Sequence, residues 1–304
     1  MSRVRFAVPF VRAGFDLALV LPIPLRLTAG PMRTAPIRLR SLAVFIAAAV
    51  AAAAPQAQPG PSLASGRAAA PRATRTPDAE TAPAFYVVAA GTAMRRAPSA
   101  AAPAVGTLRL REGVRVLGDT LADGRQWASV AFGGSRGYVP SEALSNVWIR
   151  VDKSDRTLYV YHGAELVRTL PADVSASEGD KVRRSGQDER EHWRMPEGVF
   201  YVVGLNGRSS YYRAFVLSYP NPVHALRGLE QGIIDEATYQ TILRADAAGV
   251  APPMGTRLGG LIEIHGSGSG RREAWTRGCV ALRNVHMDEL WDVVQVGTPV
   301  VIEP

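Results

Sequence analysis

Hydrophobic and polar residues alternate in short runs from residue 84 to the end of the chain. A period of two is typical of β-strands with one buried face, and the glycine, proline and aspartate residues between the runs predict turns. The pattern therefore predicts a mainly β protein with few helices. The runs fall into two series, residues 84–146 and residues 147–304, which we interpret as two domains.

The first series predicts a small antiparallel barrel. Its expected strands are Phe85–Val88, Val105–Leu108, Val114–Leu117, Trp127–Val130 and Gly137–Val139. Trp127 and Tyr138 fit two interpretations: either they form an aromatic binding face, or they fill the small core.

The second series begins with a predicted hairpin meander. The expected strands are Trp148–Val151, Leu158–Tyr161, Leu166–Leu170, Val199–Val203, Phe215–Tyr219, Leu261–Ile264 and Pro299–Ile302. One helix is predicted from Asp235 as N-cap to Gly249 after its end, and a second over Val285–Val294. The first helix either covers a cleft or packs on the sheet, and we expect packing.

Other polar and aromatic positions in this series have ordinary structural interpretations. The charged stretch Lys181–Arg194 is predicted to be a surface loop. Tyr211, Tyr212 and Tyr219 are expected in the core rather than in a cleft. The remaining histidines are expected to be solvated or packed rather than catalytic: His162 in a turn, His192 and His224 in loops, and His286 at the start of a helix.

The N-terminal part of the chain is typical of an exported protein. Arginines precede an apolar run from Leu42 to Ala54, which is too short to span a bilayer comfortably, and the small residue Ala57 follows it. We predict an extension and signal peptide over residues 1–57, with cleavage near Ala57 and translation that starts at Met32; an uncleaved anchor is the alternative. A linker over residues 58–83, rich in Ala, Pro and Ser, follows. The predicted location is the periplasm or cell envelope, with no stable membrane span after cleavage.

Composition narrows the classes of partner. The formal net charge is +8, which suits an anionic partner, but the arginines are scattered and no basic run alternates with aromatic residues, so nucleic acid is not expected. The single cysteine excludes an internal disulfide, and none of the five histidines has metal-ligand spacing. We therefore expect no metal. We also expect no cofactor, because a thiol nucleophile of the kind described below supplies the covalent step itself.

Two segments carry residues suited to nucleophilic catalysis. Residues 262–266 form a strand that ends in His265 and Gly266, and residues 276–284 contain Cys279 directly after Gly278. A histidine beside a thiol takes its proton, and a nearby guanidinium such as that of Arg277 lowers the thiol pKa. Gly278 permits a tight turn that leaves backbone amides free to bind an oxyanion. We expect a thiol with a depressed pKa that iodoacetamide labels rapidly at neutral pH; the alternative is an inert buried thiol.

The same segments carry a resemblance to a known family. The sequences IHG and TRGCVALRN resemble the His-Gly and Ser-x-Gly-Cys motifs of the L,D-transpeptidase catalytic domain. The sequence MPEGVFYVV resembles the Thr-Pro-Glu-Gly strand entry of that domain, and LSYPN resembles a segment of its murein-peptide subgroup. The likeness covers residues 147–304. In residues 84–146, the order of MRRAPS, VGTL, the tryptophan strand and GYVP resembles a bacterial SH3-like domain. The resemblance implies an SH3-like barrel followed by an L,D-transpeptidase-type β-sandwich with short helices.

The resemblance also implies roles for individual residues. Cys279 is the nucleophile, His265 the base and later acid, and the Gly266 carbonyl orients the imidazole. The amides near Gly278 stabilise the oxyanion. The substrate-binding residues it implies are Arg277 and Thr276. Thr276 stands where the family has serine, Met195 where it has threonine, and Ala281 where many members have arginine.

The implied reaction is acyl transfer on peptidoglycan stem peptides. The thiolate attacks the amide before the terminal D-Ala of a tetrapeptide, and D-Ala leaves. The thioester then passes to an amine of another stem or to a lysine of a wall-attached protein. Water as the acceptor would make the enzyme a hydrolase, and a non-catalytic wall-binding protein is the alternative from another class.

Overall fold

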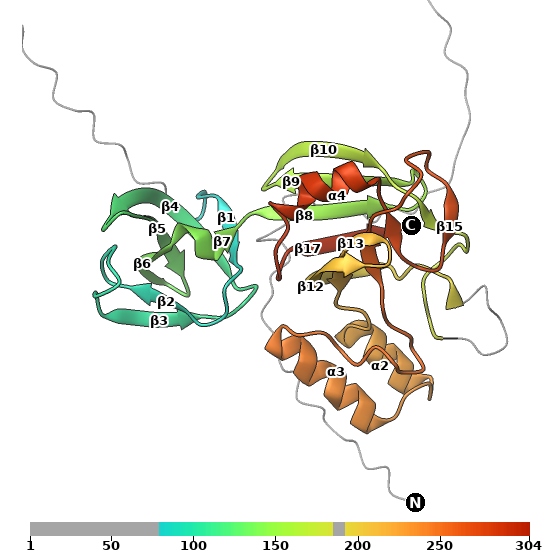
Figure 1. Cartoon of the computed structure of the whole chain (residues 1–304). Coiled ribbons are helices and arrows are strands. Elements are labelled where there is room, and N and C mark those ends of the chain that lie inside the picture. Colours follow the sequence, from blue (N-terminus) through green and yellow to red (C-terminus); the bar gives the residue numbers. More distant parts are fainter. Residues whose placement is uncertain (1–78, 185–191) are drawn as a thin grey trace, which may run out of the picture. The chain divides into compact units, whose positions relative to one another are not determined.

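The computed structural model describes residues 79–184 and 192–304 (Figure 1). The predicted signal peptide, its cleavage site and nearly all of the predicted linker lie outside these residues. Within them, no helix is long and apolar enough to cross a membrane. Strands far outnumber helices, so the prediction of a mainly β protein is confirmed.

Seven antiparallel strands form the N-terminal sheet, in the order β3-β2-β6-β5-β4-β1-β7. Their bounds are β1 Ala84–Val87, β2 Thr92–Arg95, β3 Ala104–Leu108, β4 Gly113–Ala122, β5 Arg125–Phe132, β6 Ser135–Pro140 and β7 Leu144–Ser145, with the 3-10 helix η2 at Ser141–Ala143. Trp127 on β5 is 1% exposed, so it fills the interior instead of forming a binding face. Tyr138 on β6 is half-buried.

An eight-stranded sheet follows, in the order β10-β9-β8-β17-β12-β13-β14-β16. The bounds are β8 Val147–Asp152, β9 Thr157–His162, β10 Glu165–Pro171, β12 Gly198–Ser209, β13 Tyr212–Leu217, β14 Glu263–His265, β16 Val280–Ala281 and β17 Pro299–Glu303. The predicted meander is present as β8, β9 and β10. Two strands, β11 (Val174–Ser175) and β15 (Ala274–Thr276), form a separate parallel pair.

Three α-helices accompany this sheet: α2 (Pro222–Glu230), α3 (Glu236–Ala248) and α4 (Asn284–Trp291). Helix α3 matches the prediction, because Asp235 caps its first turn and Gly249 ends it at a φ of 68°. Helix α4 ends three residues earlier than predicted.

Helix α2 was missed, although its signals are present in the sequence: Asn221 is the N-cap and Pro222 occupies the first turn. Figure 1 shows α2 and α3 side by side. They share a small apolar cluster that contains Ala225 of α2 and Ile242 of α3. Helix α3 therefore packs on α2, where we had expected it to pack on the sheet. Helix α4 instead contributes Met287 and Leu290 to the main core.

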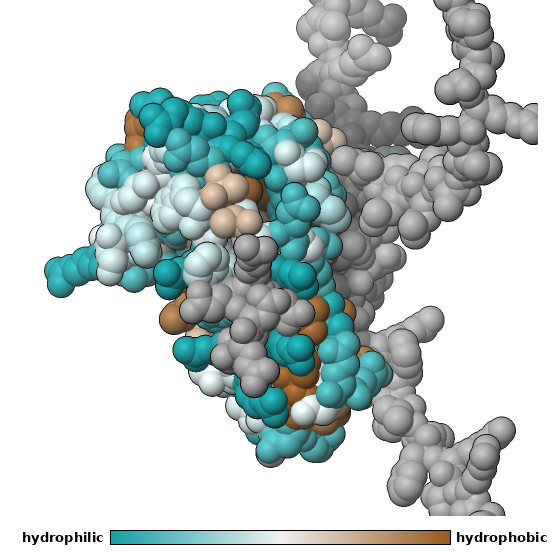
Figure 2. Space-filling view, turned by 90° about the vertical axis from the view of Figure 1, so that its right-hand side faces the viewer, coloured by the Kyte–Doolittle hydropathy of each residue, from teal (hydrophilic) through white to brown (hydrophobic). Residues whose placement is uncertain are grey.

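The main core lies against the eight-stranded sheet and α4. Its fully buried members include Ile149, Leu158, Phe200, Leu217, Ile264 and Val280. On the face shown in Figure 2, teal (hydrophilic) and pale residues predominate, and brown (apolar) residues gather mainly in the lower part. Burial of apolar area in this core is the main stabilising contribution that the sheet receives.

We expect Leu158→Ala to lower the free energy of unfolding by about 2–5 kcal/mol, because it leaves a cavity in the core. Leu166→Ala on the neighbouring strand is the matched control, since Leu158 is 0% and Leu166 is 48% exposed. The control should change stability by no more than about 0.5 kcal/mol. Urea denaturation followed by tryptophan fluorescence measures both. Equal effects of the two substitutions would contradict this account of the core.

Candidate active site

Two short strands, β14 and β16, bring the predicted histidine and cysteine to one face of the sheet. They pair in parallel, with Ile264 opposite Val280 and His265 opposite Ala281. Ile264 and Val280 are buried in the main core. Because side chains alternate between the faces of a strand, His265 and Cys279, each one position away from these two, point together to the opposite face.

The imidazole of His265 is held by its own loop. Its Nδ1 lies 2.7 Å from the carbonyl oxygen of Gly266, the acceptor that was predicted. A carbonyl oxygen only accepts, so Nδ1 carries the proton and Nε2 is the acceptor of the neutral ring. Glycine is required at position 266, because a Cβ there would lie 2.6 Å from Oδ1 of Asn284 and 2.8 Å from the carbonyl oxygen of Tyr211.

Two aromatic rings cover the imidazole. Tyr211 stacks on it with ring centroids 4.5 Å apart, and Trp275 lies edge-on at 6.3 Å. His265 is therefore 2% exposed, whereas Tyr211 is 46% and Trp275 is 41% exposed. Burial lowers the pKa of His265, and the hydrogen bond to Gly266 and the charge of Asp173 act in the opposite direction. The ring is neutral at pH 7 and can accept a proton.

The segment before the cysteine is tightly packed. Gly278 has a φ of 110°, and a Cβ there would lie 2.9 Å from the carbonyl oxygen of Arg194 and 3.0 Å from Cδ1 of Ile262. The hydroxyl of Thr276 donates to the carbonyl oxygen of Cys279 over 2.6 Å. Thr276 is also buried. Its hydroxyl therefore fixes the backbone at Cys279 and is not presented to solvent.

The thiol is a weak acid in this site. Its Sγ lies 3.5 Å from the carbonyl oxygen of Leu261. Burial raises the pKa of Cys279 to about 11, with the charge of Glu263 in the same direction; a hydrogen bond with the Glu263 backbone and the charge of Lys181 act against it. Our expectation of a depressed thiol pKa was wrong, because the cost of placing a thiolate among buried groups exceeds the stabilisation by neighbouring charges.

Arg277 is two residues from the cysteine in sequence, but its guanidinium lies over the ring of Trp193. Its guanidinium sits 4.8 Å from the centre of the Trp193 ring, and the residue is exposed. A cation that remains in solvent lowers a neighbouring thiol pKa little. Its position leaves Arg277 accessible to an anionic group of a ligand.

Asp173 is a site residue that the sequence analysis missed. Its carboxylate accepts hydrogen bonds from the Ser269 amide and hydroxyl (2.6 and 2.8 Å), the Glu273 amide (3.0 Å) and the Trp275 indole (2.8 Å). Its backbone also exchanges two hydrogen bonds with Ala281. Asp173 thus joins β16 through its backbone and the loop between the histidine and the cysteine through its carboxylate. The signal in the sequence was a lone aspartate inside an otherwise apolar run.

Other predictions have mixed outcomes. Tyr219 is a core residue, as expected, but Tyr211 lies exposed on the imidazole. His224 was expected in a loop, and it is buried in α2. The stretch that was predicted to be a surface loop is described in part, and its first residue, Lys181, is buried.

Comparison with known proteins identifies both parts of the chain. The family profile of the L,D-transpeptidase catalytic domain matches residues 146–302, and that of the bacterial SH3 domain matches residues 90–145. No curated protein matches the sequence.

Several solved structures are similar to this chain. An L,D-transpeptidase from Xylanimonas cellulosilytica is 19% identical over 52% of this chain and 61% of its own, with a TM-score of 0.32. The helical cell shape determining protein Pgp2 from Campylobacter jejuni is 21% identical over 52% and 46%, with a TM-score of 0.34. An L,D-transpeptidase from Mycobacterium smegmatis is 14% identical over 72% and 81%, with a TM-score of 0.30. This chain therefore spans about three fifths of the length of the Xylanimonas cellulosilytica protein and about half of the length of Pgp2.

Replacing Asp173 by asparagine should loosen the loop that it organises. Burial would raise the pKa of Asp173, but the hydrogen bonds from Trp275 and Ser269 outweigh it and lower the pKa below the ordinary 3.8. The stabilisation is thus complete above pH 3.8 and is lost as the pH falls through the lower, folded-state pKa. We expect Asp173→Asn to cost about 1–3 kcal/mol at pH 7 and less in acid. Urea denaturation at several pH values tests this, with exposed Asp155→Asn as the control; equal losses in both variants would refute it.

Removing the ring that covers His265 should change its titration. Tyr211→Ala relieves part of the burial, so the pKa of His265 should rise toward its ordinary value. Tyr212→Ala is the matched control, because the Tyr212 phenol binds Asp288 at 2.8 Å. The pKa is measured by NMR titration, with the signal assigned through His265→Gln. A pKa that stays unchanged in Tyr211→Ala, or rises equally in both variants, would contradict the proposed cover.

Proposed function

Because this chain belongs to the L,D-transpeptidase family, we propose that it is a cysteine acyltransferase that acts on the stem peptides of peptidoglycan. The observation that carries the proposal is the common orientation of two side chains. The register of β14 and β16 directs Cys279 and His265 to the same face of the sheet, and Nε2 is the acceptor nitrogen of the neutral imidazole. This arrangement suits proton transfer from the thiol as it attacks a carbonyl carbon.

In the first step, the thiol of Cys279 attacks the amide carbonyl that precedes the terminal D-Ala of a tetrapeptide stem. The S–H proton moves to Nε2 of His265 while the S–C bond forms. Backbone amides at Gly278 and Cys279 stabilise the oxyanion, a contribution typically worth about 10²–10³ in rate for each donor. The C–N bond then breaks, the imidazolium protonates the departing amine, and D-Ala leaves behind a thioester.

In the second step, an amine attacks the thioester and restores the thiol. An amine of another stem yields a cross-link, and a lysine of a wall-attached protein yields a tether. His265 removes the proton from the incoming amine and returns it to the sulfur. Water in place of the amine gives hydrolysis and a tripeptide stem.

The resting state fits general-base catalysis better than a preformed ion pair. The pKa of Cys279 is raised to about 11 and that of His265 is lowered, so both groups are neutral at pH 7. Proton transfer then accompanies bond formation, at the stage where negative charge moves from sulfur to the carbonyl oxygen. A protonated thiol also resists oxidation between turnovers, because the thiolate is the reactive form.

Other residues of the site suit binding of a stem peptide. Arg277 is exposed beside the nucleophile, where its charge can pair with a carboxylate of the substrate. Trp275 and Tyr211 offer partly exposed aromatic surface on either side of the imidazole. The predicted export to the periplasm or cell envelope would place the enzyme with this substrate.

Substitution of the nucleophile tests the reaction directly. With a disaccharide-tetrapeptide as substrate, Cys279→Ala should abolish D-Ala release, and His265→Gln should reduce it by about 10²–10⁴-fold. His162→Gln, at an exposed position at the end of β9, is the control and should retain full activity. Mass spectrometry of the products separates cross-linked dimers from tripeptides. Undiminished turnover by Cys279→Ala would refute the proposed function.

A further inference from the structure

Lys181 is a buried cation close to the proposed nucleophile. The residue is 1% exposed, although it was predicted to begin a surface loop. Its ammonium donates a hydrogen bond to the carbonyl oxygen of His192. Among residues 79–184 and 192–304, no carboxylate forms an ion pair with it. A buried ammonium bound to a carbonyl group rather than a carboxylate keeps its charge available to other groups nearby.

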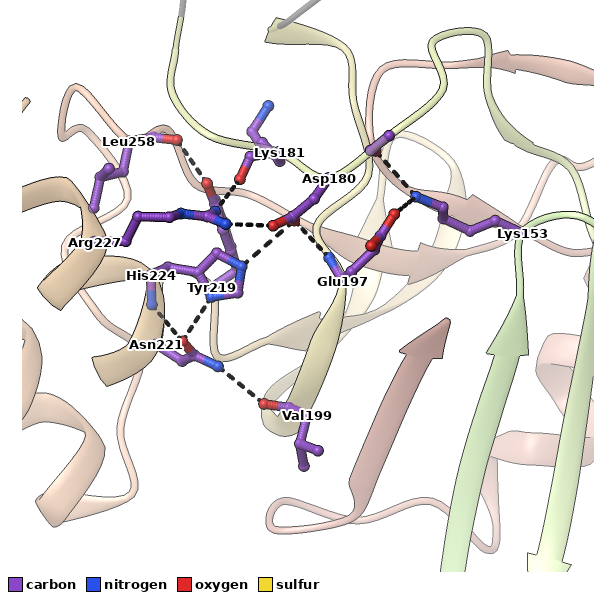
Figure 3. Close-up of polar contacts among 11 residues, drawn as sticks. Lys153, Asp180, Lys181, Glu197, Val199, Tyr219, Asn221, His224, Arg227 and Leu258 are labelled. Atoms are coloured by element: carbon purple, nitrogen blue, oxygen red, sulfur yellow. Dashed lines mark hydrogen bonds and ion pairs between the residues drawn. The ribbon is translucent and has the colours of Figure 1, made fainter. Parts of the chain in front are cut away.

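A polar cluster on helix α2 fixes the backbone that carries this lysine (Figure 3). The guanidinium of Arg227 lies 2.5 Å from the carboxylate of Asp180 and 2.7 Å from the carbonyl oxygen of Lys181. Asp180 also accepts from the Glu197 amide over 2.9 Å and lies 3.7 Å from Nε2 of His224. Asp180 is thereby engaged with α2, and Figure 3 shows the lysine ammonium pointing away from this cluster.

The segments that surround the ammonium also surround the thiol. Cε of Lys181 lies 3.2 Å from the position that a Cβ on Gly259 would occupy, and two residues later the carbonyl oxygen of Leu261 accepts the thiol hydrogen. In a second segment, the His192 carbonyl accepts a hydrogen bond from the ammonium, and the Arg194 carbonyl lies against Gly278, next to the cysteine. Both contacts place Lys181 in the wall of the site.

We propose that Lys181 is the charge partner of Cys279, a cation built into the site to stabilise the negative charge that develops on sulfur as the proton leaves. This inference rests on the proposed role of Cys279 as nucleophile. His265 takes the proton, and Lys181 compensates the charge, so the two groups have separate tasks. The cluster on α2 serves this task by holding residues 180 and 181 in place.

The charged groups around the sulfur explain why such a partner is needed. Glu263 lies on the same strand as His265, and its charge opposes a thiolate. Lys181 is the cation that acts on Cys279 in the favourable direction. Burial lowers the pKa of Lys181 to about 8. The charge of Cys279 raises this pKa, and the charge of Arg184 lowers it. At pH 7 the lysine is therefore still protonated.

Two alkylating reagents that differ in charge test this inference without any substrate. Cys279 is the single cysteine, so every alkylation event reports on it. Iodoacetamide is neutral and iodoacetate is an anion, and both react with the thiolate. The ratio of their rate constants cancels the thiolate fraction and reports the local charge. Because no acyl transfer is involved, a negative result here is distinct from failure of the proposed function.

At pH 7, Lys181→Met should react with iodoacetamide about tenfold more slowly than the wild type, the effect of one pKa unit. Its iodoacetate-to-iodoacetamide ratio should fall as well. Lys181→Arg should keep a ratio near that of the wild type, because it retains the charge. The control is Arg125→Met, which removes one positive charge from the N-terminal sheet, where Arg125 pairs with Glu142. This control should change neither the rate of reaction with iodoacetamide nor the iodoacetate-to-iodoacetamide ratio.

The inference is overturned if folded Lys181→Met, checked by circular dichroism, keeps both the wild-type rate and the wild-type ratio. Should this variant not fold, the wild-type ratio decides. A ratio above that of a neutral cysteine peptide at the same ionic strength supports a cation beside the thiol. A ratio at or below that of the peptide contradicts the presence of a cation beside the thiol and overturns the inference.

Discussion

The parallel pairing of β14 with β16 is the constraint on which the site depends. Each strand is too short to be stable alone, and each owes its place to apolar side chains that the main core buries. Because Ile264 and Val280 must face that core, His265 and Cys279 must face away from it, and they do so at the same edge of the sheet. The position of the reactive groups follows from the burial of their neighbours, since a shift of one residue would turn both side chains inward.

A parallel pair needs a long connection, and this one is organised by a single carboxylate. Asp173 gathers the amides and the indole of the loop between β14 and β16, and its backbone joins the edge of β16. The same loop supplies Trp275, which contributes to the cover over His265. Polar groups that would be costly to bury unpaired therefore determine the shape of the loop. The site is rigid where the histidine needs orientation, and its exposed aromatic rim remains open to a ligand.

Burial sets the protonation states in a way that the residue types do not reveal. Thiol and imidazole are both desolvated, so their pKa values move apart and neither carries charge at pH 7. In the resting state, such a site therefore carries no desolvation cost for a preformed ion pair. In the reaction that we propose, charge is instead compensated while the thiol attacks, by backbone amides at the carbonyl oxygen and by Lys181 at the sulfur. On that proposal, helix α2 supports the site through the contact of Arg227 with Asp180, although the helix lies outside the two motifs.

Local patterns in the sequence determined the strands of the meander, the capped helix α3, and the two motifs with His265 and Cys279, because alternation, capping and glycine-dependent turns act over a few residues. The Gly266 carbonyl was foreseen for the same reason, since it neighbours the histidine. Tertiary structure alone decided the roles of Asp173 and Lys181 and the high pKa of the thiol. These depend on contacts between segments about 100 residues apart along the chain and on the exclusion of water, and no local pattern encodes either.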